Sequence, residues 1–165
     1  MIELRPFATQ DLALLRQCNT PAMTAHLGGP ETPEALVVRL RRYVEDASPG
    51  AMRVIVSNGE AAGSIGYWEH ADGETTVWEI GWAVLPTFQG RGIASAAIRA
   101  VVDLAAAHQV HQELHAYPSV ANEASNALCR KASFVLLGSL EFEYPKGHWM
   151  RCNDWSLRLD AVADK

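Results

Sequence analysis

The chain has few of the features that mark secreted, metal-stabilised or membrane-bound proteins. Its three cysteines are scattered and form no C-x-x-C pair, which argues against a disulfide framework and against structural zinc. No apolar run approaches the ~20 residues that a membrane-spanning helix requires, and Glu3 and Arg5 interrupt any signal peptide. Repeats and low-complexity linkers are also missing. We therefore expect a cytoplasmic protein that does not bind a membrane.

Positive charge is scarce as well. The formal net charge of −5 disfavours non-specific binding to nucleic acid and leaves room for a cationic amine to be attracted. A length of 165 residues with 48% apolar residues predicts one domain, 1–165, with a sizeable core. His108, His111 and His115 recur at intervals of three and four, but the predicted helix ends between them, so we expect no metal site.

The chain does contain a strand that leads through a glycine turn into a helix. The apolar run 78–85 is followed by Gln89-Gly90-Arg91-Gly92-Ile93-Ala94 and an alanine-rich helical segment. Backbone N–H groups in a first helical turn lack partners within the helix, and the helix dipole adds positive charge there, which favours phosphate. The two glycines allow a diphosphate to approach the main chain closely. The Lys-Ser/Thr pair of a P-loop and the third glycine of a dinucleotide motif are missing, so nucleotide binding is the weaker alternative.

Hydrophobic periodicity and turn residues predict an α+β (mixed α/β) fold in the order β-α-α-β-β-β-α-β-α-β-β. The sheet should have about seven strands and be mostly antiparallel, with one parallel pair joined by a right-handed crossover after the glycine turn. Thr9 and Thr32 are candidate helix caps, and Asn58-Gly59 is typical of a hairpin turn. The expected strands are 2–5, 52–57, 62–68, 76–85, 113–117, 135–142 and 152–159, and the expected helices are 9–18, 32–44, 92–109 and 122–131.

Three segments carry a family resemblance. The first block follows the expected strand that contains Glu79. Its residues Gln89, Gly92 and Ala94 occupy the fixed positions of a Q/R-x-x-G-x-G/A pattern. A later block, 122–134, begins with Asn and ends with Lys-x-Ser-Phe. These blocks, with the opening segment 4–12, resemble the GCN5-related N-acetyltransferase (GNAT) family, and the overall pattern is closest to the branch of ribosomal-protein N-terminal acetyltransferases (RimJ/RimL-like) and their small-molecule relatives. The resemblance implies the GNAT fold, in which two central parallel strands splay apart to admit the cofactor.

The resemblance also implies acetyl-CoA as the acyl donor. Pantetheine amides would pair with backbone groups where the strand ending at Val84 loses its neighbour, and the diphosphate would lie on the amides of the glycine turn. Asn122 is expected to approach the pantetheine as well as to cap its helix, whereas Gln89 is expected to shape the loop. The candidate cofactor-binding residues are Ala83, Val84, Leu85, Gln89, Gly90, Arg91, Gly92, Ile93, Ala94, Ser95 and Asn122.

Acetyl transfer to an amine needs a base, and Glu79 is the candidate because it interrupts an apolar strand where burial would raise its pKa. The alternative is that strand alternation turns Glu79 to solvent. For the acid, Cys129 stands where the family often has Tyr, and Ser125 lies on the same predicted helix. A buried packing role for Cys129 and a local hydrogen bond for Ser125 are the alternatives. Ser133 replaces the glycine of the later motif, which is costly if that position needs a positive φ.

These observations predict an N-acetyltransferase in which a primary amine attacks acetyl-CoA directly in a ternary complex. The acceptor is a small molecule or a peptide N-terminus, and its walls would come from loops 23–30 and 145–151. Trp68, Trp82 and Tyr117 are candidate substrate-binding residues, although core packing is the default for strand aromatics. A non-catalytic acyl-CoA sensor of the same fold is the alternative function, and a homodimer is a candidate assembly.

Overall fold

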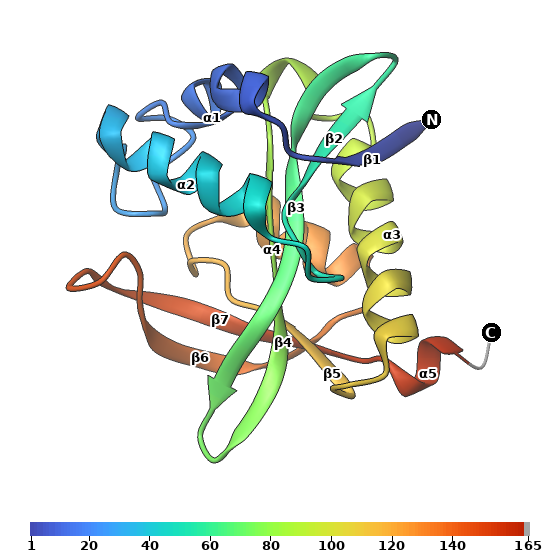
Figure 1. Ribbon diagram of the computed structural model, residues 1–165. Helices are drawn as coiled ribbons and strands as arrows, with labels where there is room; N and C mark the ends of the chain where they lie inside the picture. The colour runs from blue at the N-terminus through green and yellow to red at the C-terminus, as the bar shows by residue number, and fades with distance from the viewer. Residues whose placement is uncertain (164–165) are drawn as a thin grey trace.

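The computed structural model describes residues 1–163, which form a seven-stranded sheet with helices on both faces (Figure 1). The strand order is β1-β2-β3-β4-β5-β7-β6, and neighbouring strands are antiparallel except for β4 and β5. This confirms the predicted mixed sheet with one parallel pair. The strands are β1 (Ile2–Pro6), β2 (Arg53–Ser57), β3 (Glu60–Asp72), β4 (Thr75–Val84), β5 (Glu113–Ala116), β6 (Val135–Glu143) and β7 (Trp149–Arg158).

The helices follow the predicted order, with a short addition at the end of the chain. The second helix starts where its sequence signals place it, because the Thr32 hydroxyl accepts a hydrogen bond from the Ala35 N–H at 3.2 Å and Pro33 occupies the first position. No helix within residues 1–163 has the length and apolar character to cross a membrane. The helical segments are η1 (Thr9–Asp11), α1 (Leu12–Cys18), α2 (Pro33–Glu45), η2 (Pro86–Phe88), α3 (Ile93–His108), α4 (Glu123–Lys131) and α5 (Asp160–Ala163).

The first helix differs from its prediction. Thr9 does not cap it: the segment opens as a 3₁₀ turn, and the Asp11 carboxylate accepts a hydrogen bond from the Ala8 N–H at 2.7 Å. The same carboxylate pairs with Arg5 at 2.8 Å, so the turn is tied to β1. Strand β7 begins at Trp149, three residues before the predicted start, because residues 149–151 pair with β6 across a hairpin.

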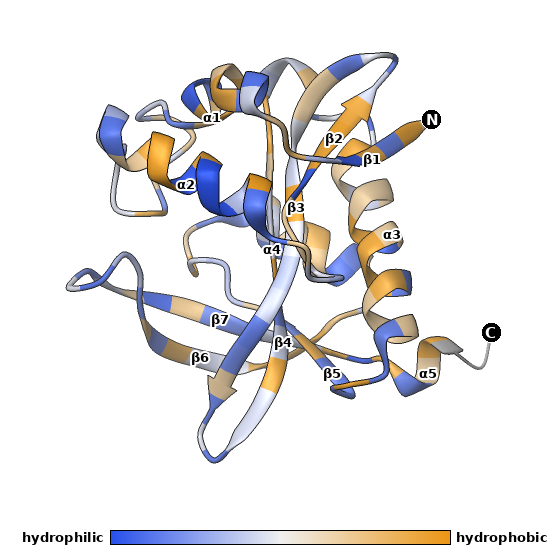
Figure 2. Ribbon diagram, in the orientation of Figure 1, coloured by the Kyte–Doolittle hydropathy of each residue, from blue (hydrophilic) through white to orange (hydrophobic). Residues whose placement is uncertain are grey.

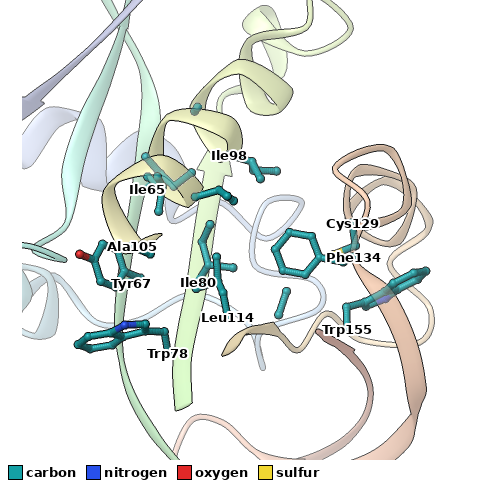
Figure 3. Packing of buried hydrophobic residues seen from close by; sticks show 14 of the residues in the cluster. Ile65, Tyr67, Trp78, Ile80, Ile98, Ala105, Leu114, Cys129, Phe134 and Trp155 are labelled. Atoms are coloured by element: carbon teal, nitrogen blue, oxygen red, sulfur yellow. The ribbon is translucent and has the colours of Figure 1, made fainter. Parts of the chain in front are cut away.

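Two buried clusters lie on opposite faces of the sheet. One lies between α3 and the strands and includes Ile65, Ile80, Ile98 and Leu114 (Figure 3). The other lies beneath α1 and α2. Hydropathy along α2 alternates between apolar and hydrophilic residues, as expected for a helix with one buried face (Figure 2). The members of the second cluster are Phe7, Leu14, Leu15, Leu36, Leu40, Val54 and Leu85.

Strands β4 and β5 separate soon after they meet. Their pairing consists of Trp78 opposite Leu114 and Glu79 opposite His115. Strand β4 continues beside β3 as far as Val84, whereas β5 ends at Ala116. The backbone of residues 80–84 therefore has a strand neighbour on one side only, which produces the splay that the resemblance implies.

Backbone angles in two turns bear on the sequence predictions. Asn58 and Gly59 both have positive φ, at 50° and 83°, which is the geometry of the predicted hairpin turn. Ser133, after α4, has φ of 68°. The motif position that usually carries glycine thus requires a left-handed conformation here, which costs a non-glycine residue about 1 kcal/mol.

Candidate active site

A cavity of about 1450 Å³ opens along the splay and extends from the glycine turn to the loops beneath α2. The structure brings most of the predicted site residues to this cavity but leaves Leu85, Arg91 and Cys129 out of its lining. The predicted residues that line it are Trp68, Glu79, Trp82, Ala83, Val84, Gln89, Gly90, Gly92, Ile93, Ala94, Ser95, Tyr117, Asn122 and Ser125.

The glycine turn presents a row of unpaired backbone donors. The first hydrogen bond of α3 runs from the Ala96 N–H to the Gly92 carbonyl at 3.0 Å, and no side chain caps the helix. Within the described chain, the N–H groups of residues 90–95 have no hydrogen-bond partner. Gly90 and Gly92 have φ of 73° and 76°, and a Cβ at either position would meet no atom within 4 Å. The main chain therefore borders open space, which fits a diphosphate.

The backbone of β4 is only partly available at the splay. Both polar groups of Leu85 are engaged: its N–H donates to the Ala62 carbonyl at 2.8 Å, and its carbonyl accepts from the Phe88 N–H at 2.9 Å. Because alternate residues of a strand face the same neighbour, Ala83 also faces β3, and Val84 and Trp82 face the splay. Leu85 therefore does not offer the free backbone groups predicted for the pantetheine, and Ala83 lines the cavity although its backbone faces β3. The Gln89 side chain donates to the Val84 carbonyl at 2.9 Å, so it braces the turn.

Glu79 lies in the cavity and not in bulk solvent, because its side chain is only 13% exposed. One of its carboxylate oxygens, Oε2, accepts a hydrogen bond from the Trp68 indole at 2.9 Å and lies 3.3 Å from His70 Nδ1. Burial raises the pKa of Glu79 to about 7, although the Trp68 hydrogen bond and the charge of His115 act in the opposite direction. A carboxyl group with this pKa exchanges a proton near neutral pH, and its other oxygen is free.

Aromatic rings surround this carboxylate. His70, Tyr117 and Phe142 form a stack through Phe142, whose ring centroid lies 5.5 Å from that of His70 and 5.0 Å from that of Tyr117. The His70 and Tyr117 rings are tilted, with centroids 4.9 Å apart. The buried Tyr117 hydroxyl has no hydrogen-bond partner within residues 1–163. Sequence reasoning missed His70, although it shares a strand face with Trp68 two residues earlier. It also missed Phe142, because nothing in the sequence of its strand indicates that this residue packs against His70 and Tyr117.

Helix α4 contributes structural hydrogen bonds and the hydroxyl of Ser125, which lines the cavity. Asn122 caps the helix by accepting from the Ser125 N–H at 3.1 Å. The buried Asn126 amide donates to two carbonyls and accepts from Asn153 and Trp155, each at 2.8 Å, so it serves to join α4 to β7.

Cys129 does not reach the cavity, although the sequence suggested it as a catalytic acid. It is completely buried in the core, beside Phe134 and Trp155 (Figure 3). Burial raises the pKa of its thiol to about 12. Cys129 is therefore a buried packing residue, which was the alternative to a role as the acid. Ser125, in contrast, is half-buried and lines the cavity.

The three histidines of the sequence pattern each have other side chains as partners. Buried His115 contacts Asp154 at 2.6 Å and Glu113 at 3.1 Å; desolvation lowers its pKa, but these hydrogen bonds outweigh it and raise the pKa overall. His108 and His111 contact other side chains. Among residues 1–163 no group of three potential ligands has the geometry of a metal site.

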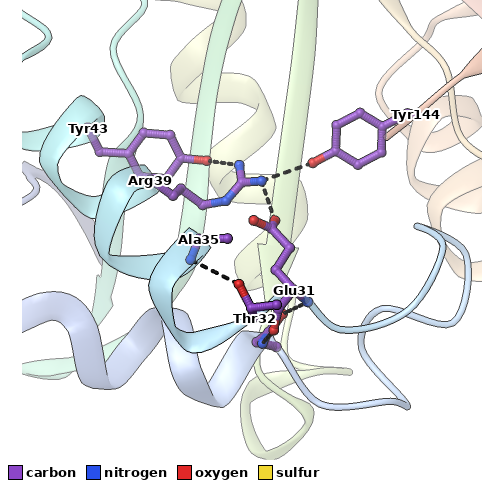
Figure 4. Close-up of polar contacts among 7 residues, drawn as sticks. Glu31, Thr32, Ala35, Arg39, Tyr43 and Tyr144 are labelled. Atoms are coloured by element: carbon purple, nitrogen blue, oxygen red, sulfur yellow. Dashed lines mark hydrogen bonds and ion pairs between the residues drawn. The ribbon is translucent and has the colours of Figure 1, made fainter. Parts of the chain in front are cut away.

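A polar network lines the cavity beside α2 (Figure 4). Arg39 on α2 pairs with Glu31 and donates hydrogen bonds to the Tyr43 hydroxyl at 2.9 Å and to the Tyr144 hydroxyl at 3.3 Å. Tyr144 follows β6, so the network ties α2 to the β6–β7 hairpin. All four residues line the cavity. Sequence reasoning placed the acceptor walls in the adjoining loops 23–30 and 145–151 and did not identify the Arg39 network.

The family assignment agrees with this geometry. Residues 2–135 match the family model described as "Acetyltransferase (GNAT) domain". The chain belongs to the GNAT acetyltransferase family. It is an N-acetyltransferase of this family. A sequence comparison with curated proteins gives no match.

Solved structures share the fold of this GNAT protein. One is the Salmonella typhimurium acetyltransferase that modifies the N-terminal serine of ribosomal protein L7/L12, with 22% identity, a TM-score of 0.78, and coverage of 95% of this chain and 94% of that one. Another is a GNAT-family acetyltransferase from Bacillus anthracis, with 18% identity, a TM-score of 0.80, and coverage of 96% and 95%. A third is the aminoglycoside acetyltransferase AAC(6')-Ib in complex with coenzyme A, with 20% identity, a TM-score of 0.80, and coverage of 100% and 99%.

Proposed function

We propose that Glu79 is the general base for direct attack of a primary amine on acetyl-CoA. The amine nitrogen bonds to the thioester carbonyl carbon and gives a proton to the Glu79 carboxylate, while the carbon–sulfur bond breaks and the thiolate leaves and acquires a proton. The observation that carries this proposal is the position of Glu79 at the fork between β4 and β5, in the same cavity as the glycine turn. Its pKa of about 7 suits a base that works near neutral pH.

For the acyl donor, we assign the diphosphate to the unpaired N–H groups of residues 90–95. The open space beside Gly90 and Gly92 supports this assignment. Arg91 lies outside the cavity lining, with its guanidinium 5.6 Å from the Phe88 ring centroid, and it adds positive charge beside the turn. The pantetheine amides would pair with the Val84 N–H and with the splay-facing backbone of Trp82, since the Val84 carbonyl already accepts from Gln89.

Ser125 is our candidate for the proton donor to the departing thiolate. It is half-buried, lines the cavity and lies in the first turn of α4, whose dipole also stabilises negative charge. Asn122 fixes this turn through its cap to the Ser125 N–H. Ser125 would act either by donating its hydroxyl proton while water returns a proton to the serine oxygen, or by hydrogen bonding to the thiolate while water supplies the proton.

The acceptor is a small molecule or a peptide N-terminus. Two of the similar structures act on such substrates, one on a ribosomal protein and one on aminoglycosides. One domain over residues 1–165, a homodimer and a cytoplasmic location stay predictions from the sequence.

A thiol-release assay with acetyl-CoA and an amine panel tests this proposal, together with calorimetry for coenzyme A. We expect release of free thiol with at least one amine and a loss of about 10²- to 10⁴-fold in kcat for Glu79→Gln. Glu69→Gln is the matched control, because Glu69 lies on the neighbouring strand with a 61% exposed side chain. Binding of coenzyme A without any thiol release would instead support the non-catalytic sensor.

A further inference from the structure

We propose that the acceptor is a primary monoamine carried on an aromatic or flat apolar body, and not a polyamine or another polycation. This inference rests on the proposed acetylation at Glu79 and names the class of amine that the same site takes. Two features of the cavity carry it: the rings that surround the carboxylate, and the scarcity of free negative charge beside them.

Trp68 is the first of these rings. It is 41% exposed although it lines the cavity and hydrogen bonds to Glu79. The end of its six-membered ring lies against Gly81, where a Cβ would be only 2.5 Å from Trp68 Cη2. Glycine at this position therefore lets the indole lie against β4, beside the carboxylate. A large aromatic surface left accessible next to the base is available for an acceptor ring.

The stack of His70, Tyr117 and Phe142 forms the second aromatic surface. It reaches the same carboxylate oxygen as Trp68, through His70 Nδ1 at 3.3 Å. The stack also contains the buried Tyr117 hydroxyl, which has no partner in the described chain. A buried hydroxyl normally finds a hydrogen bond, so a nitrogen or oxygen of a bound acceptor would complete it.

The charged residues that line the cavity do not favour binding of a polycation. Besides Glu79, the lining carboxylates are Glu31, Asp46 and Glu143. Glu31 is paired with Arg39, and the other two accept hydrogen bonds from nearby backbone N–H groups, those of Ser48 and Gly147. Glu79 itself forms no ion pair with Lys or Arg within residues 1–163. Asp46 and Glu143 are exposed to solvent, whereas Glu79 combines burial with a free carboxylate oxygen. One amine can therefore be received at Glu79, and further ammonium groups would share the cavity with the cations Arg39, Arg42 and Lys131.

The test compares 2-phenylethylamine and tryptamine with butylamine, spermidine and kanamycin, using both turnover and binding. We expect kcat/KM for 2-phenylethylamine to exceed that for butylamine and spermidine by about tenfold. Calorimetry on the coenzyme A-loaded protein should rank the amines in the same order. A higher kcat/KM or tighter binding for spermidine or kanamycin than for both aromatic monoamines would overturn the inference.

Two variants of the β6–β7 hairpin separate ring recognition from folding. Phe142→Leu should reduce the ratio of kcat/KM between 2-phenylethylamine and butylamine to about threefold or less. Trp149→Leu is the matched control, because Trp149 is 61% exposed and does not line the cavity, and it should leave the ratio unchanged. An unchanged ratio in Phe142→Leu, with a thermal transition like that of the native protein, counts against the aromatic surface.

Binding also separates this inference from the proposed function. If aromatic monoamines bind more tightly than polycations but no amine releases thiol, the acceptor class stands and the catalytic proposal fails. If amines are acetylated without any preference for rings, the catalytic proposal stands and the acceptor class fails.

Discussion

Replacing Glu79 by glutamine should make the protein more stable at pH 8 while it removes most of the activity. The reason is that the native fold holds this carboxyl group in a place that disfavours its charge, with the side chain only 13% exposed. Glutamine has nearly the same shape, and its amide oxygen can still accept the hydrogen bond from the Trp68 indole. The substitution therefore removes the buried charge without opening a cavity.

The size and pH dependence of this effect follow from the pKa of Glu79, which burial raises from 4.5 to about 7. Between these two values the folded protein holds a proton that the unfolded chain releases, so the free energy of unfolding falls as the pH rises, and it levels off above pH 7. The difference corresponds to about 3 kcal/mol at pH 8 and to little at pH 4. For a protein of this size, we expect Tm of Glu79→Gln to exceed that of the native protein by roughly 6 to 12 °C at pH 8.

Thermal unfolding of both proteins from pH 4 to 8 measures this difference. The differential measurement cancels the pH dependence of all groups that do not interact with Glu79, and it includes the response of its neighbours His70 and His115. Glu69→Gln removes only a surface ion pair with His111, at a 61% exposed side chain, and should change the free energy of unfolding by less than about 1 kcal/mol at every pH. A Tm for Glu79→Gln that is equal to or below that of the native protein at pH 8 would show that the carboxylate is not strained by burial, and the argument for its role as a base would fail with it.

Three further substitutions test the site and its frame. Ser133→Gly should raise the free energy of unfolding by about 1 kcal/mol in urea titrations, because φ is 68° there, whereas Ala132→Gly, at φ of −83°, should lower it. Asn126→Ala should lower Tm by several degrees, because it leaves buried partners of the amide without hydrogen bonds, at about 2 to 4 kcal/mol. Trp68→Phe removes the donor that lowers the pKa of Glu79, so the acid limb of kcat/KM should move about one pH unit higher, and an unmoved limb would contradict this.

Much of the frame is readable from the sequence because it depends on local patterns. Strand and helix order follow from periodicity, and the hairpin at Asn58-Gly59 and the cap at Thr32 follow from the chemistry of single turns. Thr9 shows the limit of this reasoning. Its residue type suits a cap, but Asp11 is held by Arg5 on β1, and a tertiary ion pair of this kind leaves no mark in a local window.

The acceptor side of the site is less readable because its parts come from distant segments. Phe142 reaches the stack from β6, and Tyr144 reaches Arg39 across more than a hundred residues of chain. The positions of Phe142 and Tyr144 in the sequence give no indication that either residue lies near Glu79 in the fold. Leu85 illustrates a different limit. Its backbone N–H and carbonyl are hydrogen-bonded to β3 and to the following turn. Which residues of β4 have a backbone that faces the splay is known only once the hydrogen bonds between the strands are known.

The point at which β4 leaves β5 fixes both halves of the site together. Glu79 is the last residue of β4 in the described pairing with β5, and the free backbone that follows leads to Gly92. A slip of one residue in β4 would turn Glu79 into the α3 core, and a slip of two would keep its face but move it about 7 Å along β3 and β5, away from Trp68 and His115. Because base and phosphate site lie on one continuous strand and turn, their separation is set by the number of residues from Glu79 to Gly92. That count is visible in the sequence, which is why it points to the chemistry even though the acceptor walls do not.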